Sequence, residues 1–150
     1  MSSVATGALA TLTADGAPFA SLVLTASDEA GDIILFLSRL AAHTRNLESD
    51  SRASLLAVAA GGEAGDPLAG ARVTVLGRAD RAVSETGKRR YLERHPEAER
   101  YASFGDFGFW RLRIDTVHLV AGFGRIVDLT REEMTAGGDI SASPPAEGSD

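Results

Sequence analysis

Polar and cationic side chains follow directly behind an apolar run in the first third of the chain. Residues 33–37 are an apolar run typical of a strand. Ser38, Arg39, His43 and Thr44 follow that run, and a short helix is expected to begin near Thr44 as its N-cap. Hydroxyls, cations and the free N–H groups of a helix start together suit a phosphate. We therefore expect this point, the strand-end site, to hold the phosphate of a cofactor. Spacing alone also allows an ordinary surface loop before a capped helix.

Two positions on expected strands extend this candidate site. Ser21 lies in the middle of a strand expected over residues 19–26, where a hydroxyl matters only if the strand lines a groove. Arg72 lies near the start of a well-alternating strand over residues 71–82, on its less apolar face. Arg72 is either a donor to a ligand bound against the sheet or a solvated strand arginine paired with a neighbouring acid.

The three histidines, His43, His95 and His118, match no short-range metal-binding spacing, and we expect no metal site. His95 precedes a proline and suits a helix boundary, whereas His118 alternates out of an apolar strand. The chain has no cysteine, which excludes disulfides and thiolate ligands, and it has no G-x-S-x-G nucleophile motif. No residue identifies itself as a catalytic acid or base.

Composition limits the class of protein. The 150 residues, 44% of them hydrophobic, suit one domain with a real core, expected over residues 1–130, and a disordered acidic tail is expected over residues 131–150. The formal net charge of −6 disfavours a nucleic-acid partner. No signal peptide and no apolar run of the ~20 residues that span a bilayer is visible, so no membrane contact and a cytoplasmic location are expected.

Short apolar or alternating segments separated by turn residues dominate the first 130 residues. Asp15-Gly16 is a hairpin signal after a strand over 8–13, and further strands are expected at 33–38, 53–60, 71–82, 107–114 and 117–123. A second helix, capped by Ser84, is expected to run to about Arg94. Six or seven strands with so few helices predict a closed or nearly closed antiparallel sheet, because parallel strands need crossover helices.

Several stretches, in this order, resemble the pyridoxamine 5′-phosphate oxidase-like FMN-binding split-barrel superfamily, and within it the haem-utilisation (HugZ-like) branch. They span roughly residues 5 to 128: Gly7–Leu12 with Asp15–Pro18, Leu37–Leu47, Gly65–Gly77, Arg90–Pro96, and Asp106-Phe107 with Gly122–Gly124. The combined order is specific for the family, although no single stretch is.

The resemblance implies a six-stranded antiparallel split barrel (Greek key) with two or three short peripheral helices. It also implies a homodimer that binds FMN at the subunit interface and oxidises or reduces a small-molecule substrate. By position, it assigns cofactor binding to Ser21, Leu22, Val23, Ser38, Arg39, His43, Thr44 and Arg72.

The chain departs from the oxidases of the superfamily at the phosphate. Those enzymes place an arginine on the second strand and an Arg-Lys pair at the helix start, where this chain has Ser21, His43 and Thr44. Two alternatives to the FMN-dependent oxidoreductase follow. One is a haem-binding or haem-degrading protein on the same fold, with His43 or His118 as the iron ligand. The other is a cofactor-free dimeric binding module.

Overall fold

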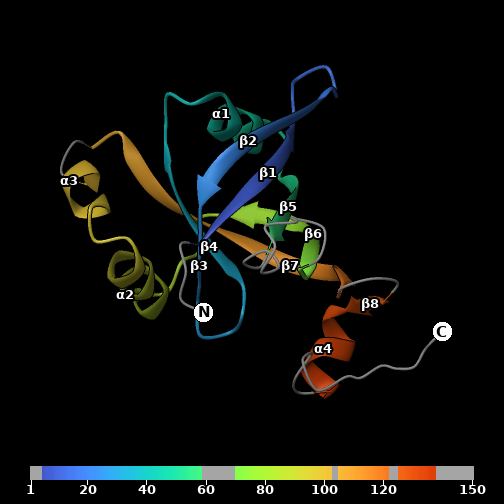
Figure 1. Cartoon of the computed structure of the whole chain (residues 1–150). Coiled ribbons are helices and arrows are strands. Elements are labelled where there is room, and N and C mark those ends of the chain that lie inside the picture. The colour runs from blue at the N-terminus through green and yellow to red at the C-terminus, as the bar shows by residue number, and fades with distance from the viewer. Residues whose placement is uncertain (1–4, 59–69, 103–104, 122–124, 138–150) are drawn as a thin grey trace.

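The computed structural model describes residues 5–58, 70–102, 105–121 and 125–137, which form eight strands and four helices (Figure 1). The predicted loop over residues 61–67 and the part of the predicted tail after residue 137 lie outside them. The strands are β1 (Thr6–Leu12), β2 (Pro18–Leu24), β3 (Ala26–Ser27), β4 (Ile33–Ser38), β5 (Arg52–Val58), β6 (Arg72–Asp80), β7 (Phe107–Val120) and β8 (Ile126–Thr130). The helices are α1 (Ala42–Ser49), α2 (Glu85–Arg94), α3 (Ala98–Ala102) and α4 (Arg131–Gly137).

All described strand pairs are antiparallel and belong to one curled sheet. The strand order is β2-β1-β5-β6-β7-β4-β3, and β8 pairs with β7 outside this path. β3 follows β2 after one residue, so the chain itself joins the two ends of the sheet, and α1 lies beside β2 while α2 and α3 lie at the other side (Figure 1). The predicted antiparallel split barrel is confirmed, with six long strands supplemented by the short strands β3 and β8.

Alternation along the strands decides which side chains enter the barrel core. Leu9, Leu55, Val75 and Val117 face one another in neighbouring strands and are all buried. β4 is apolar at consecutive positions because both of its faces are covered. Leu35 and Leu37 belong to this core, while Ile34 packs in a second cluster with Tyr91 of α2.

The two predicted helix caps have different outcomes. Ser84 caps α2 as predicted, since its Oγ accepts a hydrogen bond from the Gly87 N–H at 2.9 Å. Thr44 does not cap α1, which begins two residues earlier behind Ala41, without a side-chain cap. Thr44 is instead buried inside the first turn, where its hydroxyl donates to the Ser38 carbonyl at 2.6 Å.

β7 is one continuous strand of 14 residues, although the sequence predicted a break at Asp115-Thr116. The pairing of β7 with β6 shifts by one residue between Leu76 and Gly77, and the break is therefore a β-bulge within the strand. A Cβ on Gly77 would lie 1.8 Å from the Arg113 carbonyl oxygen, so the two backbones approach closely enough to require glycine here.

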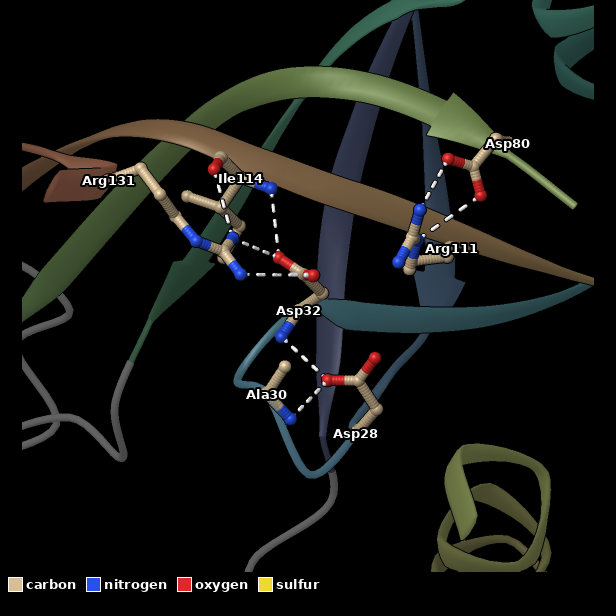
Figure 2. Close-up of polar contacts among 7 residues, drawn as sticks. All are labelled: Asp28, Ala30, Asp32, Asp80, Arg111, Ile114 and Arg131. Carbon is tan, nitrogen blue, oxygen red and sulfur yellow. Dashed lines mark hydrogen bonds and ion pairs between the residues drawn. The ribbon is translucent and has the colours of Figure 1, made fainter. Parts of the chain in front are cut away.

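The chain continues into helix α4 where the sequence predicted a disordered tail from residue 131. Thr130 and Glu133 form a capping box, in which each side chain accepts a hydrogen bond from the other's backbone N–H, at 3.2 and 2.8 Å. Arg131 ties this helix to the sheet by bonding the carboxylate of Asp32 and the carbonyl of Ile114 (Figure 2). Residues 131–137 thus belong to the fold, and the T-R-E-E signal for their helix is present in the sequence.

Candidate functional site

The strand-end site brings two of its predicted residues into direct contact. Ser21 of β2 and His43 of α1, which are 22 residues apart in sequence, meet with the Ser21 Oγ 2.9 Å from the His43 Nδ1. Ser21 is in register with Leu9 and so faces the inner side of the sheet, where α1 covers it. Burial lowers the pKa of His43 below the usual value of 6.5, and the imidazole is neutral at pH 7.

The remaining groups of the strand-end site are engaged within the protein. The Ser38 hydroxyl accepts from the Leu40 N–H at 3.1 Å. Arg39 lies 3.8 Å from Asp106 in an exposed ion pair, and Arg45 donates to the Leu40 carbonyl at 2.7 Å. The described side chains therefore offer a phosphate here a hydroxyl, a neutral imidazole and the exposed Arg39, whereas Arg45 is hydrogen-bonded to a carbonyl.

Leu22 and Val23 do not share a face, because successive side chains of a strand point to opposite sides. Val23 is buried in the core, whereas Leu22 is 77% exposed on the other side of the sheet. Arg72 is also on that other side, in β6, and β1 and β5 separate it from β2. Within one chain, neither Leu22 nor Arg72 joins the strand-end site.

The side of the sheet that carries Leu22 is unusually apolar for a surface. The paired rows of β2, β1, β5, β6, β7 and β8 place several large aliphatic side chains there, all exposed to solvent: Leu22, Leu24, Leu56, Val58, Leu76 and Ile126. We call this side the outer face. A contiguous exposed apolar surface on a sheet marks a site of interaction with a ligand or another chain.

Sequence reasoning missed the outer face, although a signal for it exists. Leu55, Leu56 and Val58 interrupt the expected alternation on β5, as do Leu22, Val23 and Leu24 on β2. Apolar residues on both sides of a strand indicate that both sides are covered in the working state.

His118 stands on this outer face. On one side, His118 of β7 lies directly opposite Thr74 of β6, which in turn lies opposite Leu56 of β5. On the other side, His118 lies opposite Asp128 of β8. The His118 Nδ1 lies 2.6 Å from the Asp128 Oδ1. The structure thus places an imidazole with a carboxylate partner among exposed aliphatic side chains.

Among the described residues, hollows lie beside the sheet. One, of about 380 Å³, opens at an end of the outer face, with Ala10, Ser54 and Leu76 in its lining and Arg52, Arg78 and Asp115 around it. A larger one of about 790 Å³ lies between β3 and α2 and is lined by Arg89, Arg90, Glu93 and Arg94 among others. None of the eight predicted site residues lines either hollow.

The third histidine is structural. His95 ends α2 as predicted, and it is buried with its Nε2 2.7 Å from the Thr25 carbonyl oxygen. Over the described ranges, no three His, Asp or Glu side chains lie together in a way that could hold a metal ion. No helix in the described part of the chain has the length and apolar character needed to cross a bilayer.

Comparison with known proteins identifies the family. The family model described as "CREG, beta-barrel" matches residues 1–136. The chain belongs to the CREG β-barrel family.

Solved and curated relatives place this family member near haem proteins. A structure described as a heme binding protein from Mycobacterium smegmatis is 39% identical with a TM-score of 0.81, over 89% of this chain and 56% of that one. A chloroplastic protein of Arabidopsis thaliana named non-canonical heme oxygenase HOZ is 37% identical over 116 residues, 72% of this chain and 33% of that protein. HutZ from Vibrio cholerae, described as a heme storage protein, is 24% identical with a TM-score of 0.56, over 78% of this chain and 85% of that one, and shows the shared fold.

These relatives confirm the resemblance to the haem-utilisation branch of the split-barrel proteins. The chain spans about a third of the length of the plant relative and just over half of the mycobacterial one.

Proposed function

We propose that this protein binds haem against the outer face of its sheet, with a second copy of the chain covering the rest of that face. The observation that carries the proposal is the outer face itself, a sheet surface on which both exposed aliphatic side chains and the imidazole of His118 stand. A porphyrin is a flat apolar disc with carboxylates at one edge, so it suits an apolar sheet surface with cations nearby. Two of the relatives above 30% identity are named for haem.

The dimensions and charge of the outer face support this ligand. From β5 to β8 the face spans three strand spacings, or about 14 Å at ~4.8 Å per spacing. Arg78 adjoins the hollow beside Leu76, where it would attract a propionate group of haem, whereas the neighbouring Arg52 is paired with Asp50. When bound, haem supplies iron-centred binding and redox chemistry, while the protein sets the axial ligand, polarity and access.

The dimer follows from the part of the outer face that lies far from His118. Leu22 and Leu24 of β2 are four strands away from β7 in the sheet order, well beyond the span proposed for haem. A second copy that packs there would cover the most exposed leucine of the face.

A haem titration tests the proposal, with leucine-to-glutamate variants as probes. We expect the wild-type chain to give a saturable Soret band at a fixed ratio of haem to protein. Leu56→Glu places a charge beneath the proposed ligand and should weaken binding by at least about tenfold. Leu22→Glu should convert a dimer into monomers in sedimentation velocity. Leu40→Glu, at a leucine that is 70% exposed but off the outer face, is the matched control and should change neither property. A Soret signal that never saturates, or one that Leu56→Glu leaves unchanged, would refute haem binding at this face.

FMN is the second candidate ligand, because Ser21 and His43 meet at the position that the family resemblance assigns to the flavin phosphate. The neutral imidazole at that position and the bond from Arg45 to the Leu40 carbonyl make it the weaker candidate. Titration with FMN separates the two candidates. Binding of FMN at the strand-end site would quench the flavin fluorescence, and this binding would be lost in Ser21→Ala but kept in Leu56→Glu.

A further inference from the structure

His118 and Asp128 form a hydrogen-bonded pair across β7 and β8. They are directly opposite in the strand register, with the His118 Nδ1 2.6 Å from the Asp128 Oδ1. A carboxylate accepts hydrogen bonds and does not donate, so the Nδ1 carries the proton of the imidazole. In this tautomer, Nε2 is the ring atom that carries the lone pair and can bind a metal.

The surroundings of the three histidines single out this one. The Nε2 of His95 is bonded to the Thr25 carbonyl and the ring is buried, so that atom is taken. His43 faces Ser21 on the inner side of β2, beneath α1. His118 is the histidine that stands on the outer face, in the same row as Leu56.

We propose that the Nε2 of His118 is the axial ligand of the haem iron and that Asp128 tunes that bond; this inference rests on the proposed function. A carboxylate that accepts the Nδ1 proton fixes the orientation and tautomer of a ligating histidine and makes the ring more basic. A more basic imidazole binds ferric iron more tightly, so Asp128 lowers the reduction potential of the iron. Asp128 is a positioning residue, since it acts through His118.

Both residues of the pair belong to one chain, and the strands that carry them are held in place by the rest of the fold. In the described sheet β8 pairs with β7. This pairing, which includes Val117–Val120 of β7, holds Asp128 beside His118. Arg131, directly after β8, bonds Asp32 and Ile114 and so fixes the end of β8 against the barrel (Figure 2). The ligand and its partner therefore sit on anchored strands, which suits a precise metal site.

Three variants test the inference by spectroscopy. His118→Ala should remove the iron–histidine stretching band from the resonance Raman spectrum of the ferrous haem complex, and added imidazole should restore an imidazole-ligated spectrum. Asp128→Asn keeps the shape but removes the charge, so it should lower the frequency of that band, raise the reduction potential and weaken haem binding by about 10- to 100-fold. His43→Ala tests the other candidate ligand: it should leave the band unchanged, and loss of the band in this variant would place the ligation at His43 instead. Leu40→Glu is the control.

The outcomes separate this inference from the proposed function. If the wild-type chain takes up no haem, haem binding itself is refuted. If the wild-type chain binds haem and His118→Ala keeps the wild-type band, the ligation is wrong while haem binding stands. If Asp128→Asn leaves the band and the potential unchanged, the tuning is wrong. Circular dichroism of each variant checks the fold, which substitutions at these exposed positions should leave intact.

Discussion

The buried carboxylate of Asp32 makes the attachment of α4 measurable. Asp32 is 2% exposed, and its charge is met by the Arg131 guanidinium and by the Ile114 N–H at 3.0 Å (Figure 2). Arg131→Ala would leave the carboxylate buried with the backbone N–H as its main remaining donor. Breaking a buried ion pair on one side costs about 3–5 kcal/mol. Because the Arg131 side chain is 32% exposed and water can partly replace it, we expect about 3 kcal/mol of lost unfolding free energy.

Urea unfolding monitored by Trp110 fluorescence gives this free energy, and a thermal scan should show a drop of roughly 6–12 °C, at ~2–4 °C per kcal/mol for a chain of this size. Arg111→Ala is the matched control. Arg111 also binds its carboxylate, Asp80, through two hydrogen bonds of 2.8 and 3.2 Å (Figure 2). Asp80 is 43% exposed, so water can take over from the guanidinium and the loss should stay below about 1 kcal/mol.

A double-mutant cycle with Asp32→Asn isolates the pair from the rest of the packing. The two single changes should be strongly non-additive, since Arg131→Ala is harmful mainly because of the charge on Asp32. Hydrogen exchange in residues 131–137 should also rise in Arg131→Ala. A loss no larger than that of Arg111→Ala would show that the burial of Asp32 does not set the cost.

Two further predictions concern the bulge and the strand-end site. Gly77→Ala should cost about 3 kcal/mol or more in urea unfolding, because its Cβ would lie 1.8 Å from a backbone oxygen. Gly16→Ala, with φ +86° and open space around it, should cost only roughly 1–2 kcal/mol, and equal losses would contradict the steric explanation. Stability should fall as the pH drops below about 6.5, because the unfolded chain protonates His43 more readily than the folded one. His43→Gln should make that fall smaller between pH 7.5 and pH 5, and an unchanged fall would locate the acid sensitivity elsewhere.

Local patterns in the sequence were sufficient for most of the elements. Asp15-Gly16 set the first hairpin, Ser84 set the start of α2, and the apolar run before Ser38 set β4 with its exact ends. These features depend on near neighbours in the chain, through turn conformation, capping and strand periodicity. The start of α1 was predicted two residues late because buried packing, rather than a side-chain cap, holds Thr44 in the helix.

The candidate site was predictable only in part, because it depends on contacts between residues that are distant in sequence. The contact between Ser21 and His43 agrees with the expected meeting of β2 with the helix start, but the family resemblance, not spacing, suggested it. The assignment of Leu22 and Arg72 to one site with them does not hold within a single chain, because strand alternation turns Leu22 to the outer face and strand order separates Arg72 from β2, whereas Val23 shares the inner side with Ser21. Whether they meet a cofactor depends on a second copy of the chain.

The sequence alone determined the antiparallel strands, their turns and the absence of cysteine chemistry, since each follows from residue type and short-range spacing. The tertiary structure was needed to show that aliphatic side chains from four strands form one outer face and that His118 stands there opposite Asp128. This depends on register, because a sheet aligns residues that are distant in sequence and a shift of one residue would turn each of these side chains to the other side.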